Sequence, residues 1–152
     1  MAEKKPEIEV VSKNRRASFE YSILETYKCG MVLTGTEIKS IRLGKVNIGD
    51  AYCVIQNEEL YVRNMHIDEY EKGGFVNHPT RADRKLLVKK TELKRLTNKL
   101  KDKGLTLVPL MVFLSENGFA KLEIALAKGK KSFDKREDIK KKDVQREIDR
   151  RL

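Results

Sequence analysis

The feature that most constrains the fold is a pair of apolar segments joined by Asn117-Gly118. Residues 105–114 are almost entirely apolar, and residues 119–127 alternate, with an apolar face made of Leu122, Ile124 and Leu126. Asn-Gly between two such segments is typical of a tight β-turn, because both residues adopt positive φ readily. Pro109 has no backbone N–H, so it marks an edge or a bulge in the first segment. The pattern predicts a long antiparallel hairpin with one buried face.

Other segments carry the same period of two. Residues 19–23 alternate, residues 31–33 form a short apolar run, and residues 51–56 and 60–67 are rich in β-branched and aromatic residues with a polar link at 57–59. Two helices are expected between strands. One is capped by Thr36 and ends at Gly44, and the other begins at Thr91, has leucines at 93, 96 and 100, and ends at Gly104.

About six strands, mostly linked as hairpins, predict a mainly β fold. An OB-fold-like antiparallel β-barrel with flanking helices fits the length of 152 residues, and a β-sandwich is the alternative. We expect residues 14–127 to form this barrel. Residues 1–13 are charged and have no periodicity, so they are expected to be a flexible arm.

The composition changes at Lys128. Residues 128–152 contain 11 Lys+Arg and 6 Asp+Glu, a net charge of +5, and their apolar residues form only a thin stripe at Val144, Ile148 and Leu152. Such a segment buries too little apolar surface to fold alone. It is expected to be a basic C-terminal tail that is disordered when free and helical when bound to a partner.

The charge balance restricts the classes of partner. The whole chain has 33 Lys+Arg and 23 Asp+Glu, a net charge of +10, which favours a polyanion: nucleic acid or an acidic membrane surface. No apolar stretch approaches a membrane span, so a cytoplasmic protein without a membrane partner is expected. His66, His78, Cys29 and Cys53 lack metal-ligand spacing, and both thiols lie in apolar runs, which predicts buried free cysteines. The sequence therefore predicts no catalytic site, no metal, no cofactor and no small-molecule substrate.

Basic residues gather at several points along the expected barrel. Clusters occur before the first strand, on the first helix, beside the irregular segment 70–84 and on the leucine helix. On an OB-like barrel such clusters are typical of contacts with an RNA backbone.

Five blocks occur in order along the chain: NRRA at 14–17, CGMVLTGTEIKSIRLGK at 29–45, HPTRADRKLL at 78–87, GLTLVPL at 104–110 and KGKKSFDKR at 128–136. In this order they are similar to the SmpB family of SsrA-binding proteins. The resemblance implies an OB-fold barrel that binds the tRNA-like domain of transfer-messenger RNA and delivers it to stalled ribosomes. It also implies a tail that enters the empty mRNA channel, where ribosomal RNA of the small subunit would be the main contact, and no catalytic activity.

The same blocks suggest the residues of the site. The expected RNA-binding residues are Asn14, Arg15, Glu37, Lys39, Ser40, Arg42, Lys45, Arg81, Arg84, Lys85, Lys128, Lys130 and Lys131. Within this set Glu37 is also a candidate for ordering the turn that presents Lys39. The expected ribosome-contacting tail residues are Phe133, Asp134, Lys135, Arg136, Val144, Ile148 and Leu152. Two positions depart from the family pattern: Phe133 stands where histidine is frequent, and Cys29 where alanine is usual.

Two other functions compete with this interpretation. A generic single-strand-binding OB module would need aromatic side chains aligned on one strand face, and the five tyrosines do not align in this way. An RNA-modifying enzyme or nuclease would need a converging polar site, and the sequence shows none. RNA that co-purifies from a bacterial lysate distinguishes them, because a rescue factor would bring down one dominant stable RNA.

Overall fold

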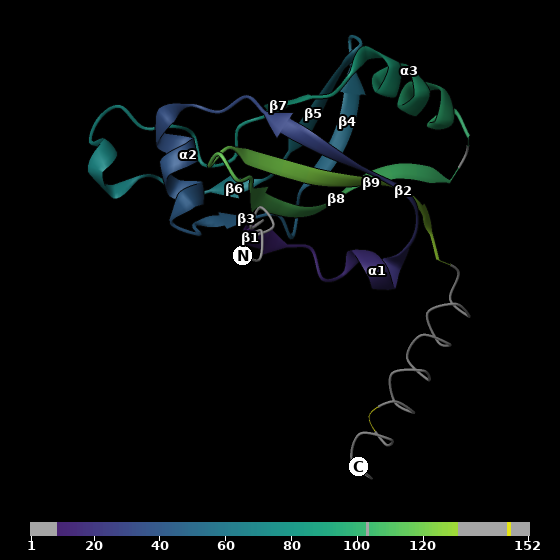
Figure 1. The fold of residues 1–152 in the computed structure, drawn as a ribbon, viewed down its shortest axis with the longest axis horizontal. Helices are drawn as coiled ribbons and strands as arrows, with labels where there is room; N and C mark the ends of the chain where they lie inside the picture. Colours follow the sequence, from purple (N-terminus) through teal and green to yellow (C-terminus); the bar gives the residue numbers. More distant parts are fainter. Residues whose placement is uncertain (1–8, 103, 131–145, 147–152) are drawn as a thin grey trace, which may run out of the picture.

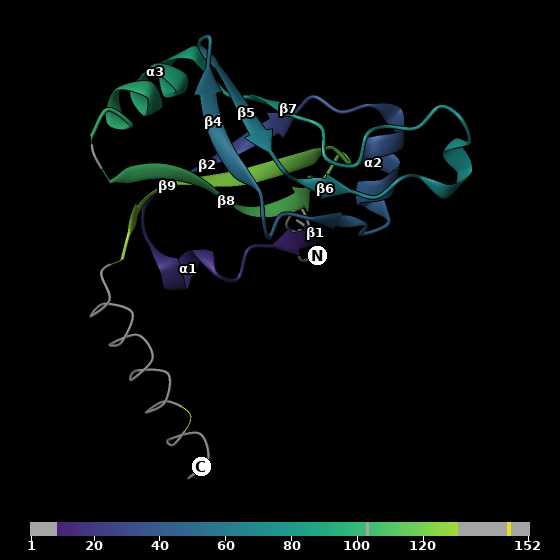
Figure 2. The ribbon, with the colours of Figure 1, turned by 180° about the vertical axis from the view of Figure 1, so that it is seen from behind.

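A curved antiparallel sheet organises the chain (Figures 1 and 2). The computed structural model describes residues 9–102, 104–130 and 146. In these residues seven strands pair in the order β1-β8-β9-β2-β7-β5-β4. Their bounds are β1 Glu9–Lys13, β2 Tyr21–Met31, β4 Tyr52–Gln56, β5 Glu59–Arg63, β7 Arg84–Leu87, β8 Leu105–Leu114 and β9 Ala120–Gly129.

The sheet curls until β4, at one end of the order, comes close to β8 near the other. A second sheet pairs β3 (Val46–Asn47) with β6 (His66–Ile67). The helices are α1 (Ala17–Glu20), α2 (Gly35–Arg42) and α3 (Lys90–Lys99), with a 3-10 turn η1 at Glu71–Gly73. The prediction of a mainly β, OB-like antiparallel fold with flanking helices is confirmed.

The β8–β9 hairpin reverses at the predicted place and has the predicted bulge, but Gly118 alone of the Asn117-Gly118 pair has a positive φ. Gly118 has φ 79° and donates its N–H to Ser115 O at 2.8 Å, which closes the turn. The register between the strands shifts between Pro109 and Met111. Pro109 therefore lies in a bulge of a strand that has neighbours on both sides, because β8 sits between β1 and β9.

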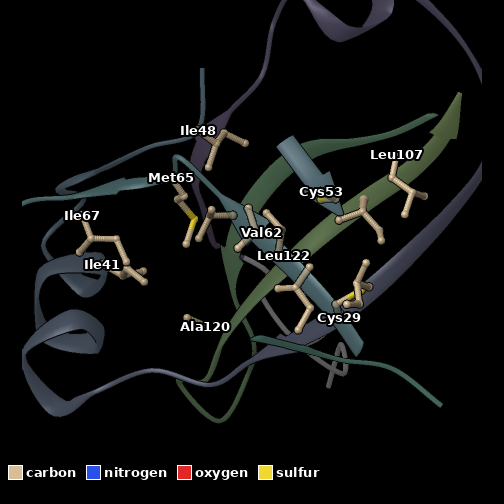
Figure 3. Close-up of a cluster of buried hydrophobic side chains, with 14 of the residues drawn as sticks. Cys29, Ile41, Ile48, Cys53, Val62, Met65, Ile67, Leu107, Ala120 and Leu122 are labelled. Atoms are coloured by element: carbon tan, nitrogen blue, oxygen red, sulfur yellow. The ribbon is translucent and has the colours of Figure 1, made fainter. Parts of the chain in front are cut away.

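The interior of the curled sheet receives side chains from most strands. Leu122 and Ile124 of β9 are fully buried, as the alternation predicts. Figure 3 shows Cys29 of β2 and Cys53 of β4 among the apolar side chains of this core. Both are free thiols, as expected, and burial raises the pKa of Cys29 to about 12.

The N-terminal segment departs from its prediction. Residues 9–13, expected in a flexible arm, form β1, which pairs with β8 from Glu9 opposite Leu114 to Lys13 opposite Met111. An edge strand of this kind is held by backbone hydrogen bonds and needs little apolar alternation; Val10 is half exposed. The charged composition of residues 1–13, without alternation, is the reason that the sequence did not predict this strand.

The segment after β1 also differs. Residues 17–20, half of which the alternation assigned to a strand, form α1, and β2 then runs unbroken through Met31. It pairs with β9 over most of its length and with β7 at Gly30 and Met31. Together with the two-residue strands β3 and β6, β1 raises the count above the six expected.

Candidate RNA-binding surface

Helix α2 begins with a complete capping box. Thr34 Oγ1 accepts from the Glu37 N–H at 3.3 Å, and Glu37 Oε1 accepts from the Thr34 N–H at 2.9 Å. The sequence prediction placed the cap at Thr36, two residues too late. The T-x-x-E spacing of Thr34 and Glu37 was the signal that identifies the correct cap.

Glu37 also anchors a buried arginine. Its second oxygen accepts a hydrogen bond from Arg84 Nε, and only 2% of the Arg84 side chain and 6% of the Glu37 side chain are exposed. Burial raises the pKa of Glu37, but the hydrogen bonds from Thr34 and Arg84 outweigh it and hold this pKa below its ordinary value. The pair therefore remains charged at neutral pH.

The Arg84 guanidinium donates hydrogen bonds to four backbone carbonyl groups. Its Nη1 donates to Met65 O and, at 3.2 Å, to Ala82 O, while Nη2 donates to Pro79 O and Thr80 O at 3.2 and 3.3 Å. A single side chain thus joins α2, the end of β5 and the segment before β7. Helix α2 and the segment before β7 carry Lys39, Arg42 and Arg81, three of the basic residues expected to contact RNA.

These elements enclose a hollow of about 720 Å³. Lys39 of α2 and Lys85 of β7 line it, with Thr34, Thr36 and Val76. Lys39 lies over the Tyr70 ring, 5.5 Å from its centroid, and Lys85 pairs with Glu59 at 3.0 Å. The hollow, here called the α2–β7 hollow, places two cations beside hydroxyl groups, an arrangement suited to a phosphate backbone.

A second group of expected residues lies by α1. Asn14 and Arg15 line a hollow of about 540 Å³ together with Lys13 and Ser18. Lys130 Nζ donates to Ser18 O at 2.9 Å, which brings the end of β9 to the same place. Lys128, near the end of β9, is exposed. Two cationic surfaces therefore carry part of the expected set, whereas Arg42, Lys45 and Arg81 line neither hollow.

Comparison with known proteins identifies the family. The sequence profile described as "SmpB protein" matches residues 11–152.

The chain belongs to the SmpB family.

Two similar members are matched along most of their length. The SsrA-binding protein of Cytophaga hutchinsonii is 56% identical over 138 residues, which are 91% of this chain and 90% of that protein. The SsrA-binding protein of Bacteroides thetaiotaomicron is 52% identical over 147 residues, 97% of each. A solved SmpB chain from work described as "tmRNA-SmpB: a journey to the center of the bacterial ribosome" is 49% identical, with a TM-score of 0.66 over 79% of this chain and 84% of that chain.

Two residues named from the SmpB blocks do not face solvent. Arg84 is 2% exposed and Ser40 is fully buried, with its hydroxyl unpaired within the described residues. Arg84 is hydrogen-bonded to Glu37 and to four carbonyl groups, so neither side chain is presented at the surface, and their contact with RNA stays a prediction. Glu37 is 5% exposed. It completes the capping box of α2, the helix that carries Lys39, in line with the alternative role suggested for it.

Three further SmpB-block residues are tied to neighbours at the surface. Arg42 donates to Gly118 O at 3.1 Å, Lys45 pairs with Glu71 at 3.3 Å, and Arg81 donates to Asn64 Oδ1 at 2.7 Å. Asn14 donates from Nδ2 to Pro109 O at 3.1 Å, covering a carbonyl at the β8 bulge. Their contact with RNA stays a prediction.

Two residues that support the α2–β7 hollow, Asn77 and His78, were not among the predicted site residues. His78 is buried; its Nε2 donates to Ile67 O at 3.0 Å, and its Nδ1 lies 2.9 Å from the Thr36 hydroxyl. Asn77 braces the same loop. The available signal was Asn77 and Pro79 on either side of His78, since Asn and Pro are frequent turn residues.

The remaining predictions of the SmpB resemblance concern the tail. Lys131, Phe133, Asp134, Lys135, Arg136, Val144, Ile148 and Leu152 lie outside the described residues. Within the described ranges, no group of three His, Cys, Asp or Glu side chains is arranged to hold a metal ion. No helix in those same ranges has the length and apolarity needed to cross a membrane.

Proposed function

We propose that this chain binds the tRNA-like domain of transfer-messenger RNA and delivers that RNA to stalled ribosomes in trans-translation. The observation that carries the proposal is the family: relatives 52–56% identical over more than nine tenths of the chain are SsrA-binding proteins. The likeness to a chain from a tmRNA–SmpB study supports the same partner.

The geometry supports RNA as the ligand. The α2–β7 hollow presents Lys39 and Lys85, and the surface by α1 presents Arg15 and Lys130. Phosphate contacts from such lysines and arginines provide most of the sequence-independent affinity for nucleic acid. The protein acts by binding and positioning RNA, with no reaction of its own.

The tail completes the proposed role. Residues 128–152 carry +5 of the net +10 charge, and the described chain leads into them from β9 beside α1, where Lys130 N donates to Glu20 O at 2.9 Å. The tail, with Asp134, Lys135 and Arg136, enters the vacant mRNA channel and contacts ribosomal RNA of the small subunit. Body and tail thus recognise two different RNAs.

The test is recovery of RNA from a bacterial lysate with tagged full-length protein. One dominant stable RNA, identified by sequencing as transfer-messenger RNA, is the expected result. A mixture of RNAs that follows their abundance would instead favour a generic single-strand-binding module. Lysate from a strain lacking transfer-messenger RNA is the matched control, in which the dominant band should disappear.

A further inference from the structure

The loop between β6 and β7 presents two apolar side chains to solvent. Phe75 is fully exposed and Val76 is 83% exposed, more than any other large apolar residue in the described part of the chain. Figures 1 and 2 show this teal loop extending beyond α2, at the end of the molecule opposite α3. A protruding aromatic side chain without an intramolecular role is typical of a binding element.

The base of this loop is held firmly. The Asn77 side chain donates from Nδ2 to Tyr70 O at 2.8 Å and accepts the Tyr70 N–H at 3.2 Å, which closes the loop across seven residues. Gly73 N donates to the same Tyr70 O at 2.8 Å. His78, bonded to Thr36 and Ile67, fixes the next residue to α2 and β6. The exposed tip therefore has a defined position.

The two glycines of the loop are required by its shape. Gly74 has φ +58° and ψ −130°, a conformation that side chains disfavour. A Cβ on Gly73 would lie 2.9 Å from Asn77 Nδ2 and 3.2 Å from the Thr36 methyl group. The tight turn places Phe75 and Val76 at the apex, where neither contributes to the buried core.

The apex stands beside cations. Val76 lines the α2–β7 hollow with Lys39, Lys85 and Val32, which is half exposed itself. Apolar flat surface next to lysines and threonine hydroxyls matches the two chemistries of an unstacked nucleotide, a planar base and an anionic phosphate. An apolar protein surface would match the exposed Phe75 but would not use the charges of Lys39 and Lys85.

We infer that the Phe75 ring stacks on an unpaired nucleobase of the bound RNA, while Lys39 and Lys85 face phosphates of the adjoining nucleotides. Val76 and Val32 cover the edge of that base. This inference rests on the proposed RNA-binding function and adds a contact that recognises single-stranded, splayed nucleotides. The loop would thereby distinguish unpaired nucleotides from paired ones. The lysines alone cannot do this, because phosphates are present in both.

The test compares Phe75→Ala and Phe75→Tyr in titrations with the tRNA-like domain of transfer-messenger RNA. We expect Phe75→Ala to weaken binding by about 5- to 100-fold, the range for removal of an aromatic group that stacks on a base. Phe75→Tyr keeps a ring and should bind within about twofold of the parent. The salt dependence should not change, because no phosphate contact is lost.

Two controls separate stacking from other effects. Leu24→Ala removes an apolar side chain of 53% exposure on β2, outside the loop, and should leave affinity unchanged. A fully paired RNA duplex should bind the parent and Phe75→Ala equally, since it offers no splayed base. Equal melting temperatures show that each variant is folded, as expected for a side chain without packing contacts.

The outcomes are distinguishable. A parent protein that does not bind the tRNA-like RNA would overturn the proposed function itself. If the parent binds and Phe75→Ala binds equally well, the stacking contact is refuted. If Phe75→Ala keeps its RNA affinity but no longer sediments with ribosomes, the tip docks on the ribosome instead, which also refutes the contact. Ultraviolet cross-linking of Phe75 to a loop nucleotide, located by mass spectrometry, is the expected direct result.

Discussion

Replacing Arg84 with alanine should destabilise the folded chain by about 3–5 kcal/mol, the usual cost of removing one partner of a buried ion pair. Glu37 and Arg84 are 6% and 2% exposed, so the Glu37 carboxylate would stay buried without its countercharge. The Thr34 N–H, at 2.9 Å, would be its remaining hydrogen-bond donor among the contacts described above. For a chain of this size the loss corresponds to a fall in Tm of roughly 6–20 °C.

The pH dependence gives the sharper test. In the parent the pKa of Glu37 lies below its unfolded value of about 4.3, so the stability it contributes is present above that value and is lost as the pH falls through the folded pKa. Without Arg84, the hydrogen bond and the positive charge that lower the pKa of Glu37 are lost. The effect of burial is then less opposed, so the folded pKa of Glu37 is higher than in the parent. The stability gap between parent and variant is therefore widest near neutral pH and narrows as acid protonates the buried carboxyl group.

The assay is urea denaturation of the parent, Arg84→Ala, Glu37→Gln and the double variant at neutral and mildly acidic pH. Arg84→Ala with Glu37→Gln should cost less than the sum of the single changes, because the two groups share one interaction. Arg95→Ala, which removes a surface partner of Glu25 and leaves Lys99 in place, is the matched control and should unfold like the parent. A loss below about 0.5 kcal/mol for Arg84→Ala, or a gap independent of pH, would refute the reasoning.

Three further predictions concern RNA. If the body neutralises about six phosphates, log K should fall against log salt with a slope of roughly −4 to −5, and near-insensitivity to salt would contradict backbone contact. Changing Lys39 and Arg42 together to alanine should weaken binding to the tRNA-like RNA with little change in Tm, since both are exposed on α2; affinity within about twofold of the parent would make them ordinary solvent charges. Deleting residues after Lys131 should preserve the fold and most RNA affinity, because β9 is complete at Gly129, and should abolish peptide tagging on stalled ribosomes; normal tagging by the truncated protein would refute the role given to the tail.

The parts of the fold that sequence predicted well are those with strong local signals. The β8–β9 hairpin was predictable because an Asn-Gly turn joined two apolar segments, and Pro109 marked its bulge. Strand β1 was not, because its pairing with β8 depends on backbone groups that no side-chain pattern reveals. Periodicity reports burial of side chains, so an exposed edge strand escapes it.

The site shows the same limit. The blocks include Glu37 and Arg84, but in the sequence a charged residue of a basic cluster looks the same whether it faces solvent or a buried partner. Arg84 is buried only because the start of β7 meets α2, where Glu37 lies 47 residues earlier in the sequence. Phe75 escaped notice for the opposite reason, since an aromatic residue is ordinarily assigned to the core.

Strand β2 has a mechanical consequence for a protein with two cationic surfaces. Its 11 residues begin directly after α1, beside Asn14 and Arg15, and end four residues before α2, beside Lys39. An extended strand of that length spans about 33 Å. Hydrogen bonds to β9 and, at its far end, to β7 hold β2 along its length, with one shift of register between Ile23 and Glu25. The two cationic surfaces are therefore joined by a hydrogen-bonded strand and not by a flexible linker. RNA bound at one surface would have a fixed distance to the other.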